Sequence, residues 1–382
     1  MRSRRILALV ASAVLVGGAC SSGTASTAPS TAPSAAQPSA AASGAPSAAA
    51  SVAASAAPSV GPAALGPGEG QLNLAVWPYY VVGGTGGEQV AGAPDWVTPF
   101  EQQTGCKVNA KVYGGSSDGV ALMKTGEYDG GAFSGDATLR LIAAGDVAPV
   151  NTALIPNYAN VFEGLKGKSH NTVGGVPYGV PHGRGENILI WRTDVVQPDP
   201  DSWSVVWEGG SKYAGKVTAY DYEIYIADAA VYLMATKPEL GIKDPYALDA
   251  TQLQAAVDLL KEQRKNITTY WSAVGAQVDA FTKGDMVVGT TWQAQVNTLE
   301  AAKVPIKSIL PKEGSTGWSD TWMVSSKAKN PNCMYMWMDY IISPVANATA
   351  TVYFGEAPVS PQGCAEAEKQ SPGHCETFHA TD

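Results

Sequence analysis

Aromatic and acidic side chains gather where predicted strands begin or end. Residues 71–81, QLNLAVWPYYV, alternate apolar and polar side chains, and Pro78 cannot extend a sheet ladder, so we expect a first strand that stops beside Trp77. Later strand boundaries carry similar residues, namely Tyr222 and Tyr225 with Asp221 and Glu223, then Trp292, then Trp318 with Asp320. A plain core does not require this recurrence, whereas open α/β sheets bind ligands at the carboxyl ends of their strands. The pattern predicts a ligand-binding cleft.

Strand-like and helical patterns alternate from residue 71 onward, which is typical of an α/β protein with a largely parallel sheet. Further strands are expected at 107–113, 128–133, 216–220 and 285–291, and helices at 96–103, 119–124 and 333–342. Asp249 is a suitable N-cap for an amphipathic helix. Residues 176–191 contain two Val-Pro steps and several glycines, which favours a crossing between two lobes.

The bulk composition limits the class of partner. The 382 residues are enough for two domains, and 45% of them are hydrophobic. The formal charge is −9, and loss of the three arginines near the start would leave 22 basic against 34 acidic residues, or −12. An acidic chain of this kind is a poor match for nucleic acid.

The first 70 residues are predicted to deliver and tether the domain. Residues 1–20 have a basic start, a short apolar run and small residues before Cys20, as in an export signal with a lipidated cysteine. Ordinary signal cleavage with a spare cysteine is the alternative. Residues 21–70 hold one charge, Glu69, and no aromatic residue, so we expect a disordered tether. The protein should therefore be exported and held by lipid at the membrane, in the periplasm or on the cell surface.

Four further cysteines agree with export to an oxidising compartment. Cys106, Cys333, Cys364 and Cys375 predict two disulfides, and the sequence leaves all three pairings open. His374 beside Cys375 lacks the paired C-x-x-C spacing of a zinc site, so we expect no metal and no cofactor.

Motifs for an enzyme are weak. The chain has no G-x-S-x-G and no H-E-x-x-H, and Gly167-Lys168-Ser169 has Phe162 where a P-loop needs glycine. Asp221 and Glu223 could still act as the paired carboxylates of a glycan hydrolase. A structural surface protein is a third class, but it gives no reason for aromatic strand ends.

The order of several short motifs resembles the spermidine/putrescine-binding subunits of ABC transporters. These motifs are Trp-x-x-Tyr at 77–80, Phe-Glu-x-x-Thr-Gly-x-Lys-Val at 100–108, Tyr-Asp at 128–129 before a strand ending at Ser134, and Pro-Lys-Glu-Gly at 311–314 followed by Trp-x-Asp at 318–320. The resemblance covers about residues 71–360.

The resemblance implies a two-lobed type II periplasmic-binding fold with the ligand between the lobes. It divides the chain into lobe one at 71–183, lobe two at 184–317 and a return to lobe one at 318–382, with every cysteine of the mature domain in lobe one. It implies a monomer that captures a polyamine-like cation for a permease without catalysis. Flat rings pack against methylene groups and attract cations, and carboxylates neutralise amines. The implied ligand contacts are Trp77, Tyr80, Ser134, Trp292, Trp318 and Asp320.

Departures from the family pattern leave the ligand open. Tyr222 and Tyr225 stand where acids are usual, with Asp221 and Glu223 close by, and Asp136 stands where a tyrosine is usual. These five complete the expected site. The alternative ligand is an amino-phosphonate, thiamine or a sugar. An amino-phosphonate would be favoured if His182 and Arg184 bind an anion. The expected role of this pair is a structural one at the hinge. The family's last segment is absent or altered after Cys364, which implies a truncated chain.

Overall fold

The computed structural model describes residues 61–381. The predicted signal, Cys20 and most of the predicted tether lie outside these residues. No helix within the described part is long and apolar enough to cross a membrane.

The first lobe is built on a five-stranded sheet with the order β2-β1-β3-β13-β6. β1 is parallel to β2 in a register from Gln71 opposite Lys107 to Val76 opposite Val112, and β3 is parallel to β1. Leu72 and Leu74 are fully buried, so the first strand and its end before Pro78 are confirmed. The strands are β1 Gln71–Val76, β2 Lys107–Val112, β3 Gly130–Phe133, β6 Val180–Pro181 and β13 Thr321–Val324.

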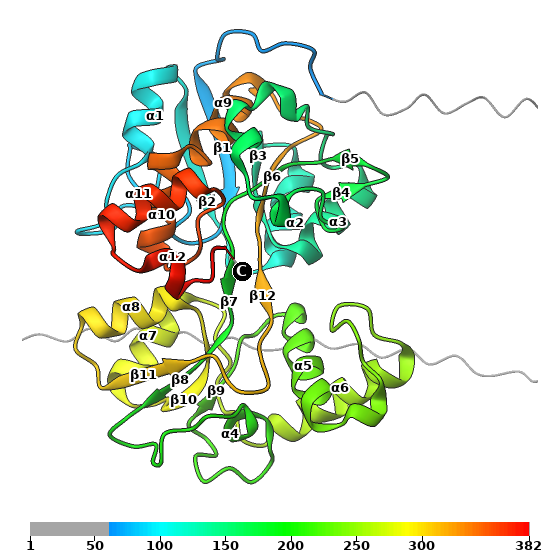
Figure 1. Cartoon of the computed structure of the whole chain (residues 1–382), viewed down its shortest axis with the longest axis vertical. Helices are drawn as coiled ribbons and strands as arrows, with labels where there is room; N and C mark the ends of the chain where they lie inside the picture. The colour runs from blue at the N-terminus through cyan, green and yellow to red at the C-terminus, as the bar shows by residue number, and fades with distance from the viewer. Residues whose placement is uncertain (1–60, 382) are drawn as a thin grey trace, which may run out of the picture. The chain divides into compact units, whose positions relative to one another are not determined.

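Helices and short hairpins complete this lobe (Figure 1). The helices are α1 Val97–Thr104, α2 Ser116–Thr125, α3 Gly135–Ala144, α9 Pro331–Ile341, α10 Pro344–Phe354, α11 Pro361–Gln370 and α12 His374–Thr377. A hairpin of β4 Thr172–Val173 and β5 Val176–Pro177 follows three short 3₁₀ turns, Thr152–Leu154, Pro156–Asn160 and Glu163–Leu165. Phe354 and Val359 belong to the core of this lobe, which places the chain after β13 in lobe one.

The second lobe has a four-stranded sheet with the order β11-β8-β10-β9. β8 is antiparallel to both neighbours, so this sheet differs from the largely parallel arrangement that we expected. The reason lies in the crossing: Ile188, at the start of β8, pairs with Thr291, at the end of β10, because the chain enters this lobe at the edge where β10 ends. The strands are β8 Ile188–Arg192, β9 Val217–Thr218, β10 Val288–Thr291 and β11 Ile306–Ile309.

Five helices belong to the second lobe. Asp249 caps α6 as predicted, because its side chain accepts the backbone N–H groups of Thr251 and Gln252 and the Gln252 side chain completes a capping box. The helices are α4 Ser204–Trp207, α5 Ile226–Thr236, α6 Ala250–Gln263, α7 Val274–Lys283 and α8 Gln293–Ala301, with 3₁₀ turns at Glu223–Tyr225 and Pro238–Leu240.

Two antiparallel segments, β7 Gly185–Glu186 and β12 Gly317–Trp318, connect the lobes and pair with each other. Figure 1 shows them between the two sheets. A Cβ on Gly185 would lie 2.3 Å from the Trp318 ring, so only glycine lets that ring lie on the β7 backbone. The crossing segment predicted at 176–191 is therefore present, and its glycine positions a ring of the cleft.

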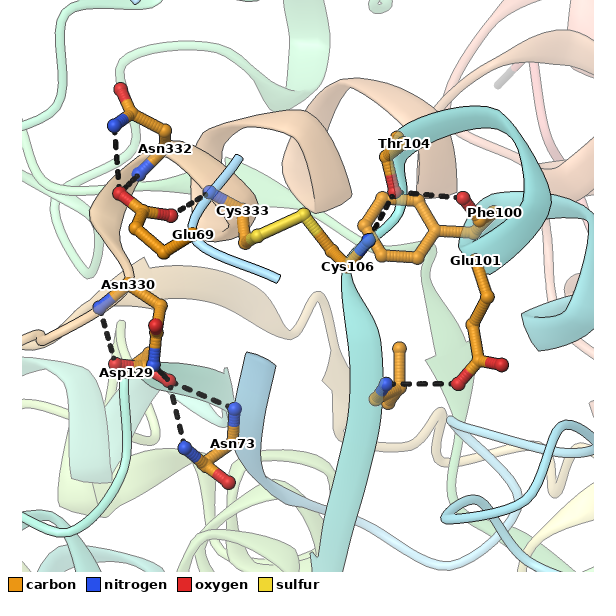
Figure 2. Close-up of a disulfide and its surroundings, with 11 residues drawn as sticks. Glu69, Asn73, Phe100, Glu101, Thr104, Cys106, Asp129, Asn330, Asn332 and Cys333 are labelled. Carbon is orange, nitrogen blue, oxygen red and sulfur yellow. Dashed lines mark hydrogen bonds between the residues drawn. A yellow bond between two sulfur atoms is a disulfide. The ribbon is translucent and has the colours of Figure 1, made fainter. Parts of the chain in front are cut away.

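The disulfides join Cys106 to Cys333 and Cys364 to Cys375, all within the first lobe. Figure 2 shows the first of them beside Glu69. The Glu69 carboxylate accepts the backbone N–H groups of Asn332 and Cys333, both at 2.9 Å, which satisfies free donors in the first turn of α9. This corrects the expected extent of the tether, because its last residues, including Glu69, contact the lobe.

Candidate functional site: a cleft between the lobes

A cavity of about 600 Å³ lies between the lobes, where strand ends of both sheets face the paired crossover β7–β12. The structure brings nine of the eleven predicted site residues to its wall. They are Trp77, Tyr80, Ser134, Asp136, Glu223, Tyr225, Trp292, Trp318 and Asp320. The carboxyl ends of the strands thus converge as the alternating pattern predicted.

Aromatic rings from both lobes meet around Trp292, which follows β10. Its ring centroid lies 6.1 Å from Trp77 of the first lobe and 6.0 Å from Trp318 of the crossover. Trp271 and Tyr220 of the second lobe lie 4.9 and 5.1 Å from it. The Trp292 indole N–H donates to Asn187 Oδ1 at 2.9 Å, which fixes the ring. These rings form an apolar wall with the negative faces that attract cations.

Asp320 is a buried acid of the cleft with two hydrogen-bonded hydroxyl groups. Its carboxylate accepts the Tyr80 hydroxyl at 2.9 Å and the Ser134 hydroxyl at 2.7 Å. Only 3% of the residue is exposed, and this burial raises the pKa of Asp320 to about 6 against the hydrogen bonds that lower it. Each oxygen can accept a further hydrogen bond, so the group can still receive a donor from a ligand.

Asp136 lies at the start of α3, on the wall that the first lobe contributes. Ser116 Oγ donates to its Oδ1 at 2.9 Å, and Oδ2 is buried with no partner among the described residues. Burial raises the pKa of Asp136, and nearby Glu223 adds to this effect. An unpaired buried carboxylate oxygen is costly, so this atom is poised for a donor.

Asp228 is a cavity residue that the sequence reasoning missed. It lies on α5, is 8% exposed, and accepts the Thr316 hydroxyl at 3.0 Å, while Asn187 donates to the same threonine. Burial raises the pKa of Asp228 to about 7. The signal was present in the sequence, because Asp228 is a lone acid inside the apolar helical run IADAAVYL.

Further aromatic and polar residues that the sequence reasoning missed line the cavity beside several aliphatic ones. They include Ser116, His170, Asn187, Tyr220, Asp244, Tyr246, Trp271, Thr316, Ser319 and Phe354.

Asp221 and Tyr222 do not line the cavity, which corrects two predicted contacts. β9 ends at Thr218, and the turn that follows directs Tyr220 inward and leaves Asp221 exposed. Tyr222 instead crosses to the first lobe, where its hydroxyl donates to Asp118 at 2.9 Å. Its ring covers Gly115, where an added Cβ would lie 1.7 Å from it. Tyr222 therefore joins the lobes and does not face the cavity.

His182 is buried beneath the cavity wall. Its ring lies 4.1 Å from the Tyr80 ring between centroids, and Nδ1 accepts the Trp322 indole N–H at 3.0 Å. Nε2 faces Glu356 at 3.2 Å, with both side chains almost fully buried. Neither His182 nor Arg184 is among the cavity residues. The pair thus gives no support to an anionic ligand, and His182 packs at the crossover as a structural residue.

The charge of the cavity wall has one sign. Its titratable acids are Asp136, Glu223, Asp228, Asp244 and Asp320, and no lysine or arginine is among the described residues that line it. Within the described chain, no cluster of three metal-ligating side chains occurs. The wall can therefore neutralise positive charge on an organic solute and offers no cation to an anionic group.

The family follows from comparison with known proteins. Residues 95–377 match the family model of bacterial extracellular solute-binding proteins. The chain belongs to this family. It is 25% identical over 299 residues to the putrescine-binding periplasmic protein PotF of Escherichia coli, covering 74% of this chain and 79% of that one. It is 24% identical to spermidine/putrescine-binding periplasmic protein 1 of Haemophilus influenzae, covering 72% of each.

A solved structure agrees on the fold of this solute-binding protein. The spermidine/putrescine ABC transporter substrate-binding protein PotD of Streptococcus pneumoniae superposes with a TM-score of 0.62 at 16% identity, covering 81% of this chain and 89% of that one. The two-lobed type II fold predicted from the sequence is confirmed.

Proposed function

We propose that this solute-binding protein captures a small polyamine-like cation outside the membrane and delivers it to the permease of an ABC transporter. The observation that carries the proposal is the cavity wall, which combines five carboxylates with a cluster of indole and phenol rings and has no lysine or arginine among its described residues. Methylene groups of a polyamine would pack on the rings and its ammonium groups would meet carboxylates. Putrescine, for which PotF is named, and spermidine and putrescine, for which the Haemophilus influenzae protein is named, agree with this chemistry.

Binding without chemistry is part of the same proposal. The carboxylates suggested for a glycan hydrolase do not share the cavity, because Asp221 is exposed outside it, while Glu223 lines it and pairs with Arg140. Ligand capture would favour the arrangement in which the lobes touch, as they do where Tyr220 donates to the Gly114 carbonyl at 3.2 Å. A lipid on Cys20 and a monomeric state complete the proposal.

Thermal unfolding of the purified full chain tests the ligand class. Putrescine and spermidine should raise the unfolding midpoint, because a ligand bound only by the folded state stabilises it. An amino-phosphonate, thiamine and an oligosaccharide should leave the midpoint unchanged. A shift with one of these alone would retain the solute-binding fold and replace the ligand class.

Asp221→Asn should change the affinity for putrescine less than about twofold, because an exposed charge outside the cavity is screened by water and salt. Calorimetric titration at physiological salt checks this result. A loss of tenfold or more would mean that the strand end after β9 turns toward the ligand, and the placement of Asp221 outside the cavity would be wrong.

Cation binding should release protons near pH 6.5. Asp320 and Asp228 have pKa values of about 6 and 7, so both are partly protonated in the free protein at that pH. A bound cation favours their ionised forms, and affinity should therefore rise as the pH increases from 5.5 to 8. Titrations in two buffers of different ionisation enthalpy measure the protons released. Net proton uptake, or affinity independent of pH, would contradict a cation beside these acids.

A further inference from the structure

Two buried acceptor atoms on the first-lobe wall of the cavity have no hydrogen-bond partner among the described residues. They are Asp136 Oδ2 and His170 Nε2, and both residues line the cavity. The function proposed above rests on the carboxylates and rings and assigns nothing to His170. A buried polar atom without a partner is costly, so two of them on one wall point to a donor that the ligand supplies.

The second nitrogen of His170 fixes which form of the ring is present. The Ser319 backbone lies close enough to the imidazole to raise its pKa, and Nε2 has no partner among the described residues, which is the arrangement expected of a ring protonated on Nδ1. Burial and the charge of Lys168 lower the pKa of His170, while the bond to Ser319 raises it. Neutral imidazole with Nδ1–H leaves a lone pair on Nε2, so this atom is an acceptor.

His170 is packed directly against the start of α3, next to Asp136. A Cβ on Gly135 would lie 3.2 Å from His170 Cβ and 3.5 Å from its ring carbon Cγ. The Thr138 hydroxyl of α3 donates to the His170 carbonyl and holds the loop on the helix. The histidine and the aspartate thus belong to one corner of the wall, and both come from the first lobe.

We propose that Asp136 and His170 together receive one ammonium group of the solute, through Oδ2 and Nε2. The inference rests on the proposed function, because it requires a cationic ligand, and it adds the recognition of N–H groups. A primary ammonium carries three donors and can serve both atoms, with one left for a further acceptor of the wall. A quaternary ammonium has no N–H and would leave both acceptors unpaired. The corner therefore selects primary amines over quaternary ones of similar charge.

Charged groups around His170 come from each element near it. Asp136 lies on α3, Asp320 follows β12, Lys168 is in the same loop, and Glu223 faces Asp136 from the second lobe. The carboxylates strengthen cation binding on ionising, whereas protonation of His170 would abolish its acceptor. His170 thus adds its own loss of affinity at acidic pH to the loss that the carboxylates cause.

Calorimetric titration of the full chain with putrescine at pH 7.5 tests the inference. His170→Phe keeps a planar ring without the acceptor and should weaken binding about tenfold, whereas His170→Gln restores an acceptor near Nε2 and should bind within about threefold of the unmodified protein. Because glutamine does not titrate, the affinity of His170→Gln should fall less at acidic pH than the affinity of the unmodified protein. The bis-quaternary analogue of putrescine should bind at least tenfold more weakly than putrescine to the unmodified protein. In His170→Phe this difference between the two ligands should become smaller, because one of the two acceptors is gone.

Several results would overturn the inference. If the unmodified protein binds putrescine and His170→Phe binds it equally, the ammonium does not meet His170 and the proposed function stands. If the unmodified protein binds no polyamine, the proposed function fails and this contact fails with it. Should His170→Phe not fold, the Nε2 resonance of His170 in the unmodified protein provides the answer, because it must move when putrescine saturates the site.

Discussion

Replacing Asp320 with asparagine is expected to weaken putrescine binding about a hundredfold or more, and to make the ligand-free protein more stable above pH 7. The affinity falls because the ammonium loses a buried, hydrogen-bonded carboxylate, a loss on the order of 2 to 5 kcal/mol. Asparagine has nearly the same shape, so one of the Tyr80 and Ser134 hydroxyls keeps an oxygen to donate to and the other can accept from the amide NH2.

The stability change has the opposite sign because Asp320 is an acid whose folded-state pKa is raised. Its pKa is about 6 in the folded protein against 3.8 for an unperturbed aspartate, so the folded state loses stability as the pH rises from 3.8 through 6, and this loss persists at higher pH. Asparagine removes this cost, and we expect a gain of about 1 to 2 kcal/mol at pH 8. Urea unfolding at pH 8 and at pH 4.5 measures it, and the gain should be clearly smaller at the lower pH, where the folded-state carboxyl is already protonated.

Two variants serve as controls for Asp320→Asn. Asp320→Ala should lose the same affinity but also lose stability, because the Tyr80 and Ser134 hydroxyls would be left without their acceptor. Asp258→Asn removes an exposed acid on α6 and should change neither property. If Asp320→Asn bound putrescine as well as the unmodified protein, the ammonium would have to lie elsewhere in the cavity.

The sequence predicted the parts of the site that depend on local pattern. The alternation in β1 and the proline after it placed Trp77 and Tyr80 at the cavity, since a strand's length and end are set by neighbouring residues. The alternation could not tell which side chain of the turn after β9 faces inward. That direction depends on the antiparallel entry of β8 and on the packing of Tyr222 over Gly115, which are contacts far apart in the chain.

Residues on helices and loops were the hardest to predict. Asp228 reaches the cavity from α5, and His170 from a loop whose path is fixed by Thr138. Neither position follows from strand periodicity, because helix orientation and loop placement are decided by tertiary packing. Cysteine count predicted two disulfides, but only the fold selects one of three pairings, since it brings Cys106 and Cys333 to a Cα separation of 5.8 Å.

Removing the disulfide between Cys106 and Cys333 is expected to cost more stability than removing the one between Cys364 and Cys375. The first links residues 227 apart in the chain and the second residues 11 apart. Loop-closure entropy then gives about 5 kcal/mol for the first and about 3 kcal/mol for the second. The first bond also anchors β2 to α9, and Glu69 covers the α9 end of the link, as Figure 2 shows.

Urea unfolding of the two double alanine variants measures the difference, and each variant serves as the control for the other. Both should keep their affinity for putrescine if they fold, because none of the four cysteines lines the cavity. Equal destabilisation would mean that the unfolded chain already holds residues 106 and 333 close together. Both bonds lie within the first lobe, and neither spans the paired segments β7 and β12. The disulfides can therefore stabilise the first lobe without linking the two lobes covalently.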